Sequence, residues 1–399
     1  MLHCKDNLPQ RARDRLALSL PRSRSVISTV FSIDLLLFCG ATALFDAIRF
    51  HSRLNPELPG LVAFDSAARE LSYADIAKRV DNATYQLTQA DLAPRLRIGV
   101  HCHDRLLHII AVLALSRIGD ATFVFASDGS FAPGSIDLLV TDKGENGGRL
   151  KTVVLDPLSS NCSNSEHTHA DRAASATWQF NGLTLEGDVL RARIAQRSTA
   201  KAAGGATRWL CAADIHSELG LSAVIECLSS GGLAILSNGT FSDDVLPIRL
   251  YEADHLFVGG EQALGYLNGF DQTNGTSARL RSAVIAGASL DDSAAERVKR
   301  LITPDTVLHL DLPETGTFAA CSYWQIGKPR RYWPLPGVKL RLVANGQPAD
   351  AKASAHVAIK SDGALRSAKR NDARGRFHDG WFHSALAGSF ARDGALILS

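Results

Sequence analysis

Apolar residues recur with two different periods along most of this 399-residue chain, and the two periods alternate. Arg97–Cys102 and Ala121–Phe125 are short apolar runs with the length and composition of buried strands. Between them, Arg105–Ile118 has the length of an apolar helix. Because parallel strands need a long crossover between them, this strand–helix–strand order predicts a mainly parallel sheet.

The same alternation continues on both sides of this unit. A helix is predicted for Tyr73–Leu87, which follows a cap-like Ser72 and carries apolar residues at helical spacing. The remaining predicted elements are strands at 137–142, 151–156, 207–213, 232–236 and 280–287 and helices at 43–54, 219–229 and 291–301. Residues 157–177 are rich in Ser, Asn and His and predict a surface loop.

From Gly327 onward the pattern changes to that of antiparallel strands. Val338–Val343 and His356–Lys360 alternate with period two, and Asn345–Gly346 is a strong hairpin signal. A chain of this length is also too long for one simple core. The predicted fold class is therefore α/β, with layered, mainly parallel sheets and flanking helices at 45–326 and a small antiparallel β subdomain at 327–399.

The N-terminal segment 1–44 has a composition of its own. Residues 1–24 carry six Lys and Arg residues against two Asp residues, and Ser25–Leu44 is mostly apolar. This order resembles a signal peptide or membrane anchor. Asp34 lies inside the apolar run, however, and a carboxylate at mid-membrane depth costs ~2.5–3.5 kcal/mol on insertion scales. We therefore expect a leader or packing segment and a cytoplasmic protein, with export or anchoring by residues 25–44 as the alternative.

Composition and motif searches narrow the chemistry. The net charge of +2 gives no reason to expect a nucleic-acid partner, and seven cysteines without a Cys-x-x-Cys pair predict neither a disulfide framework nor a zinc knuckle. The nucleophile elbow, the Walker loop and the dinucleotide fingerprint are all absent. His101 and His103 share one face of a strand, with His108 the nearest third imidazole, but the spacing fits no standard zinc pattern. We interpret these three histidines as structural.

Leu312–Gly316 reads Leu-Pro-Glu-Thr-Gly, which matches a sortase sorting signal. Such a signal needs a following apolar span and a basic tail. No apolar span of about 18 residues follows Gly316. The match is therefore interpreted as accidental.

Seven segments in chain order resemble motifs of the adenylate-forming superfamily, which includes acyl-CoA synthetases, aryl-CoA ligases and peptide-synthetase adenylation domains. They are Leu71–Ile76, Gly99–Phe125, Asp214–Gly220, Ala286–Leu290, Leu310–Gly316, Gly327–Val343 and Gly380–Ser384. The resemblance covers residues 45–399. It implies the fold of the large N-terminal domain, activation of an acyl or aryl carboxylate with ATP and Mg²⁺, and transfer to CoA or a carrier protein.

The resemblance also implies roles for particular residues. His216, Gly287 and Ala288 match the substrate pocket of the superfamily. Glu314 and Thr315 match the nucleotide motif, in which Glu314 corresponds to the magnesium carboxylate.

Other positions depart from the superfamily pattern. The phosphate-binding loop is missing between Phe180 and Asn181, and Leu310 and Pro313 stand where the motif has an adenine-side aromatic residue and a threonine. Leu386 stands at the ribose-binding aspartate, and the small C-terminal lid domain is expected to be absent after Ser399. We therefore expect an acyl-CoA synthetase-like protein with impaired ATP chemistry, for which binding of ATP and Mg²⁺ is in doubt.

Three alternatives stay open at this point. The protein could be a non-catalytic scaffold that binds acyl groups or carrier proteins in a fatty-acyl, polyketide or peptide-synthetase pathway. It could be a divergent ligase that borrows a lid domain from a separate chain. It could also be a decaying gene product without function. A membrane partner is not expected.

Overall fold

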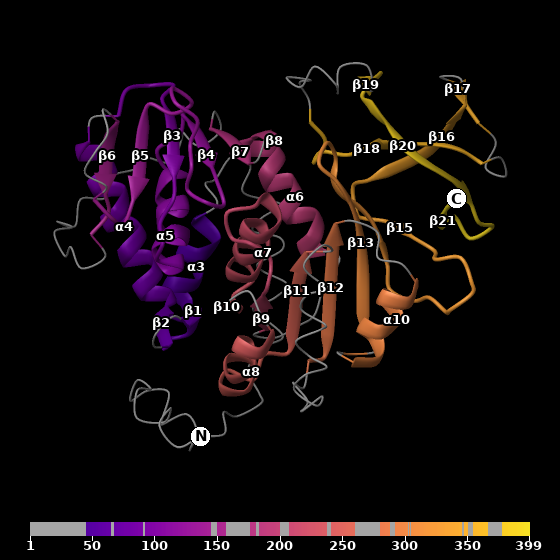
Figure 1. Ribbon diagram of the computed structural model, residues 1–399, viewed down its shortest axis with the longest axis horizontal. Coiled ribbons are helices and arrows are strands. Elements are labelled where there is room, and N and C mark those ends of the chain that lie inside the picture. The colour runs from indigo at the N-terminus through magenta and orange to yellow at the C-terminus, as the bar shows by residue number, and fades with distance from the viewer. Residues whose placement is uncertain are drawn as a thin grey trace.

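The computed structural model describes residues 45–64, 68–90, 92–144, 150–156, 176–180, 183–199, 207–237, 241–259, 280–287, 292–301, 303, 305–344, 347–349, 354–365 and 377–399. The segment 1–44, most of the predicted loop 157–177, Ala288 and Asn345–Gly346 lie outside these residues. Three sheets and their helices make up the described part (Figure 1).

The six-stranded sheet carries the first strand–helix–strand unit that the sequence predicts. Its order is β6 (Lys151–Val154), β5 (Leu138–Thr141), β3 (Arg97–Val100), β4 (Thr122–Phe125), β7 (Thr177–Phe180) and β8 (Leu183–Glu186). Neighbouring strands are parallel from β6 to β7, and only β8 runs antiparallel to its neighbour.

The nine-stranded sheet is parallel in its centre and antiparallel at both ends. Its order is β15 (Trp333–Pro334), β14 (Gly316–Cys321), β13 (Thr306–Leu312), β12 (Ser282–Gly287), β11 (His255–Gly259), β9 (Arg208–Cys211), β10 (Leu233–Leu236), β1 (Pro59–Phe64) and β2 (Ala68–Ser72). The strands from β13 to β1 are parallel, so their carboxyl ends meet at one edge.

The third sheet is wholly antiparallel. It consists of β17 (Gln347–Pro348), β16 (Lys339–Ala344), β18 (Ala355–Lys360), β20 (Trp381–Phe390) and β19 (Phe377–His378), and β21 (Leu396–Leu398) pairs with β20. It forms the orange-to-yellow part of Figure 1. The predicted fold class, mainly parallel α/β layers with an antiparallel β unit, is thereby confirmed.

Local sequence signals explain where the helices begin. The helices are α3 (Asp46–Leu54), α4 (Tyr73–Gln89), α5 (Arg105–Leu115), α6 (Gly187–Thr199), α7 (Glu218–Ser229), α8 (Phe241–Leu250) and α10 (Asp292–Leu301). Ser72 and Asp75 form a full capping box at the start of α4, as the sequence predicts. The side chain of Asp104 caps α5 by accepting hydrogen bonds from the backbone amides of Leu106 and Leu107.

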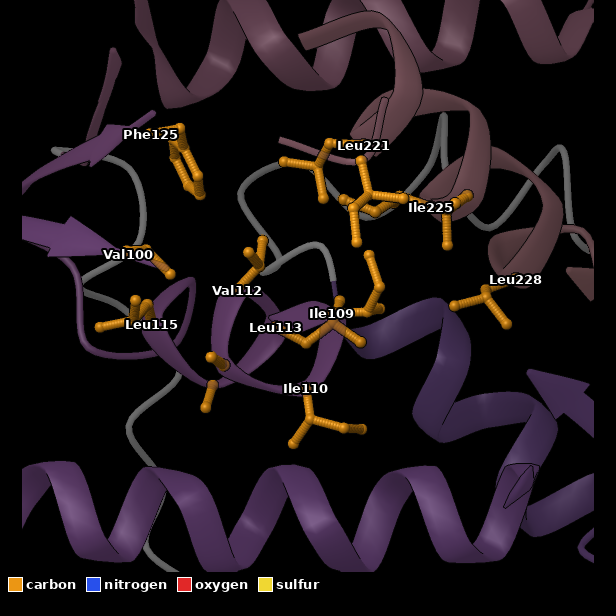
Figure 2. Packing of buried hydrophobic residues seen from close by; sticks show 14 of the residues in the cluster. Val100, Ile109, Ile110, Val112, Leu113, Leu115, Phe125, Leu221, Ile225 and Leu228 are labelled. Carbon is orange, nitrogen blue, oxygen red and sulfur yellow. The ribbon is translucent and has the colours of Figure 1, made fainter. Parts of the chain in front are cut away.

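Two hydrophobic cores hold the layers together. Every residue of α5 from Leu106 to Leu115 is buried, because this helix packs on both sides in the first core. Figure 2 shows Leu221 and Ile225 of α7 lying toward Ile109 of α5 in that core. The second core joins the nine-stranded sheet to the antiparallel sheet and includes Phe318 and Phe382.

Two further features of the helices concern the candidate site and the predicted location of the protein in the cell. Helix α6 contacts β7 and β8 of the six-stranded sheet as well as β14 of the nine-stranded sheet, so it links the two sheets. Within the described part of the chain, none of the helices combines the length and the hydropathy that a bilayer crossing requires.

Candidate functional site

Four histidines gather where the two parallel sheets meet, and we call His101, His103, His108 and His216 the imidazole cluster. His101 and His103 follow β3, His108 lies in the first turn of α5, and His216 follows β9. The ring centroid of His216 is 4.3 Å from that of His108 and 5.1 Å from that of His101. The His101 ring also contacts that of His103, at 5.0 Å. The carboxyl ends of two separate sheets thus supply one group of rings.

Two carboxylates flank the cluster. Asp142 accepts hydrogen bonds from the backbone amides of His103 (3.0 Å) and Asp104 (2.7 Å), and its Oδ1 lies 3.3 Å from Nδ1 of His103. Asp214 accepts from the backbone amide of His216, and its Oδ1 lies 3.0 Å from Nδ1 of that ring. Although burial opposes the charge, these hydrogen bonds lower the pKa of Asp142 and of Asp214. Both carboxylates are therefore ionised at neutral pH.

Several ring nitrogens of the cluster are buried without a hydrogen-bond partner among the described residues. They are both nitrogens of His108, Nε2 of His216 and Nδ1 of His101. Burial first, and then the neighbouring imidazoles, lower the pKa of His108 and of His101, so these two rings are neutral at pH 7. An unsatisfied buried polar group costs about 1–3 kcal/mol. Several unmatched buried nitrogens in one place therefore call for a ligand or a functional role that explains them.

Two of the three predicted pocket residues, His216 and Gly287, lie along one edge of the nine-stranded sheet. Gly287 ends β12 with φ +109° and pairs with Leu310 of β13. His216 follows β9, and β11 lies between β9 and β12. Ligands of open parallel sheets bind outside the carboxyl ends of the strands, so this edge is suited to a pocket. Ala288 lies outside the described residues, and the pocket role of all three residues stays a prediction.

Glu314 and Thr315 lie in the tight turn between β13 and β14. Thr315 is fully buried, and its hydroxyl donates to the carbonyl of Gly316 (3.2 Å). Glu314 is half-buried, and its backbone carbonyl accepts from the amide of Leu365 (2.9 Å). No three His, Cys, Asp or Glu side chains of the described residues form a group able to hold a metal ion. Magnesium binding by Glu314 stays a prediction.

A buried arginine of α6 packs against this turn and hydrogen-bonds to its backbone. Arg193 is 2% exposed, and it donates from Nε to the carbonyl of Gly363 (2.9 Å) and from Nη2 to that of Pro313 (2.8 Å). A Cβ atom added to Gly316, which has φ +68°, would lie 2.9 Å from Nε of Arg193. The guanidinium therefore occupies the space directly against the turn that carries Glu314.

Arg193 belongs to a wider set of buried charges, and we call Arg193, Arg197, Glu218 and Asp311 the arginine network. Nη2 of Arg197 lies 3.3 Å from Oε1 of Glu218, and Nη1 of Arg193 lies 3.9 Å from Oε2. Burial opposes the charge of Glu218, but the two arginines lower its pKa. Burial and then Glu218 raise the pKa of Asp311 to about 6. The sequence interpretation missed this network, although arginines four residues apart on one helix face were a usable signal.

Three positions that match nucleotide contacts of the superfamily carry side chains without a hydrogen-bonding group. Leu310 and Leu386 both pack on the second core, and an alkyl side chain offers a ribose no hydrogen bond. Pro313 has no hydroxyl for a phosphate, and its carbonyl is already bonded to Arg193. Leu310 is buried, Leu386 is half-buried and Pro313 is exposed, and impaired ATP chemistry stays a prediction.

Comparisons with known proteins agree with the fold. Neither a family model nor a curated protein matches the sequence. Among solved structures, unliganded o-succinylbenzoate coenzyme A synthetase from Bacillus subtilis is similar over 88% of this chain and 81% of its own, with TM-score 0.71 and 16% identity. The amide bond synthetase McbA from Marinactinospora thermotolerans gives TM-score 0.71 and 17% identity over 88% of this chain and 78% of its own.

The N-terminal subdomain of NpsA from Klebsiella oxytoca, in complex with 3-hydroxybenzoyl-AMSN, is similar over 90% of this chain and 99% of its own. Its TM-score is 0.72 and its identity 14%. At such identities the likeness concerns the fold. The chain therefore has the fold of the N-terminal domain of the adenylate-forming enzymes, as its ordered sequence motifs predict.

Proposed function

We propose that this protein binds an acyl or aryl carboxylic acid, free or carried by a thiol, at the carboxyl edge of the nine-stranded sheet, and that it forms little or no acyl adenylate. The binding half of the proposal is supported by His216 of the imidazole cluster and by Gly287, which both lie on that edge. It is also supported by the fold relatives, since the NpsA subdomain is bound to a hydroxybenzoyl compound and an o-succinylbenzoate coenzyme A synthetase to a product analogue.

One observation carries the loss of adenylation. Leu310 and Leu386 match the adenine and ribose contacts of the superfamily, but Leu310 is buried in the second core and the partly buried Leu386 packs against it. Removing a single well-placed electrostatic contact commonly costs ~10²–10³ in rate. The loss of several such contacts is expected to remove adenylation at a useful rate.

The test is a titration of the full chain with two sets of ligands. Short-chain, long-chain and aryl carboxylic acids are added one at a time, and ATP with Mg²⁺ is added separately and then together with each acid. We expect at least one acid to stabilise the protein, by about 2.7 kcal/mol at a hundredfold excess over its Kd. We expect no heat from ATP–Mg²⁺ and no pyrophosphate exchange with any acid.

Two variants show whether the bound acid uses the proposed edge. His216→Leu is expected to weaken binding, whereas His356→Leu changes an exposed histidine of β18 and should leave it unchanged. Clear pyrophosphate exchange with any acid would overturn the non-adenylating half of the proposal. Failure of every acid to bind would overturn the other half.

A scaffold that binds a carrier protein is the second candidate. It is supported by the similarity to an artificially fused adenylation–carrier di-domain built from NpsA and ThdA, with TM-score 0.72 over 91% of this chain. In that case an acylated carrier protein should bind without ATP, and the free acid should bind weakly or not at all.

A further inference from the structure

The imidazole cluster lies between two layers of the molecule that are also held by apolar contacts, by hydrogen bonds from Arg105 to the carbonyls of Phe64 and Ser237, and by the ion pair of Arg69 with Asp104. His101 and His108 come from the β3–α5 unit of the six-stranded sheet, and His216 comes from the β9–α7 connection of the nine-stranded sheet. The His216 ring stacks on that of His101 with an angle of 23° between planes, and it is tilted by 56° against that of His108. Titratable rings thus form part of the contact between the sheets at this edge.

The unmatched nitrogens of the cluster are mainly lone-pair acceptors. Nδ1 of His216 faces the ionised Asp214, so this nitrogen carries the proton and the buried Nε2 carries a lone pair. His101 forms a hydrogen bond with the backbone of Ala126, which leaves its buried Nδ1 unmatched. His108 is fully buried with a donor and an acceptor that both lack partners among the described residues. Very little space remains between rings 4.3 Å apart, so the smallest acid, a proton, is the fitting ligand.

The charges around the rings determine how many protons the closed cluster can hold. The groups that face it are His103 and Asp104 ahead of α5, Asp128 after β4, Asp142 after β5, Asp214 before His216, and the buried thiol of Cys102. Two of these carboxylates lie directly against one ring each, namely Asp142 against His103 and Asp214 against His216. His108 has no carboxylate in hydrogen-bond contact among the described residues. A charge on His108 would therefore be buried beside the ring of His216 without direct compensation.

We propose that the imidazole cluster is a proton-operated latch: its neutral rings hold the β3–α5 unit against the β9–α7 connection, and protonation of His108 or His101 releases this edge. The consequence for ligand binding rests on the proposed function, because His216 belongs to both. Above pH 6.5 the latch is closed. Burial lowers the pKa of His108 and His101 in the closed form, whereas the opened form binds these protons near pH 6.5, so the closed form loses stability as the pH falls below that value.

Hydrogen–deuterium exchange on the full chain tests the latch without any ligand. Exchange of peptides covering 101–110 and 212–221 is followed from about pH 8 to about pH 5.5 and corrected for the intrinsic pH dependence of exchange. We expect protection in both peptides to fall by at least about tenfold toward the acidic end. Peptides of β16 and β18, which lie in the antiparallel sheet, should show no comparable change.

Variants assign the effect to the cluster. His108→Leu keeps the buried volume apolar and removes one titrating ring, so the acid-induced loss of protection should shrink by several fold, while His356→Leu should behave as the parent chain does. If His108→Leu does not fold, imidazole NMR titration of the unmodified protein replaces it, and at least two rings must titrate below pH 6.5. Equal acid-induced opening in the parent and in His108→Leu, or titration of all rings near pH 6.5, would overturn the latch.

Ligand addition separates this inference from the proposed function. If a bound acid protects both peptides at pH 7.5 and is released as they open, the latch regulates the site. If low pH opens the cluster but no carboxylic acid binds at neutral pH, the proposed function is refuted and the latch is supported. If a carboxylic acid binds but low pH does not open the cluster, the latch is refuted and the proposed function is supported.

Discussion

Arg193→Met is expected to destabilise the protein strongly, because it removes one centre of the arginine network. Arg193 is almost fully buried, donates to the carbonyls of Gly363 and Pro313, and faces Glu218. Methionine fills much of the volume, so the loss is mainly electrostatic. Breaking a buried ion pair by removing one partner costs about 3–5 kcal/mol, since the other charge is left uncompensated. Arg197 remains beside Glu218, so the lower half of this range is expected.

Thermal and urea unfolding, followed by circular dichroism, measure this loss. An unfolding entropy of roughly 2 cal/mol/K per residue over 399 residues converts 3–5 kcal/mol into a fall in Tm of about 4–6 °C. Arg300→Met is the matched control, because Arg300 is an exposed arginine in α10, and it should change stability by less than about 0.5 kcal/mol.

A double-mutant cycle with Glu218→Gln shows whether the loss is electrostatic. Neutralising Glu218 removes the uncompensated charge, so the two substitutions together should cost less than the sum of the single ones, by about 1–3 kcal/mol. The reasoning would be refuted by strictly additive effects, or by a loss for Arg193→Met of less than about 1 kcal/mol.

Three further predictions concern single substitutions. Asp311→Asn should become more stable than the parent as the pH rises from 3.8 to about 6, and it should keep that advantage at higher pH. The reason is that the raised pKa of Asp311 makes its ionised form unfavourable in the folded state. Urea unfolding across this range should show the stability difference level off near pH 6. Gly316→Ala should cost more than Gly394→Ala, since both glycines have positive φ but only the first new Cβ would meet a side chain, that of Arg193; the difference should exceed about 1 kcal/mol in thermal unfolding. Leu221→Ala should cost about 2–5 kcal/mol in the first core, against less than about 1 kcal/mol for the half-exposed Leu54→Ala, and similar losses for both would argue against the packing in Figure 2.

Local signals predicted helices α3, α4, α5, α7 and α10 and strands β3 to β6, β9, β10, β12, β16 and β18, whereas helix α6 and the other strands were not predicted from them. The capping box at Ser72 lies at the start of α4, and the predicted strand Lys151–Asp156 is found as Lys151–Val154. Helix α8 (Phe241–Leu250) was not predicted, since it contains Pro247 and has no clear apolar face. The short strand β15 was missed for a different reason. Trp333 and Pro334 form it only by pairing with β14, which depends on the tertiary structure.

The site was less predictable than the fold, because its contacts join residues far apart in the chain. His101, His103 and His108 were interpreted as structural from their spacing, and nothing in that spacing indicated the contact with His216, more than a hundred residues later. The arginine network likewise joins α6 to a turn at Pro313. Sequence motifs singled out Glu314 and Thr315, but the guanidinium packed against their turn could be found only from the structure.

The two buried charge systems respond to pH in opposite directions, and this opposition bears on the conditions in which the protein works. The imidazole cluster favours the folded state above pH 6.5 and loses that contribution as the pH falls, because its buried rings must become charged. Asp311 contributes most below 3.8 and loses its contribution as the pH rises to about 6, because its buried carboxyl must ionise. Between pH 3.8 and 6.5 neither system makes its full contribution to the stability of the folded state, so the pH of greatest stability is not determined by one of them alone. Replacing Asp311 by Asn removes the loss between pH 3.8 and about 6 and leaves the contribution of the histidines in place. Between about pH 4 and 6 the stability of that variant should therefore rise with pH more steeply than that of the parent, and a variant profile that stays flat from about pH 4 to 6.5 would show that the imidazole cluster does not titrate with unfolding.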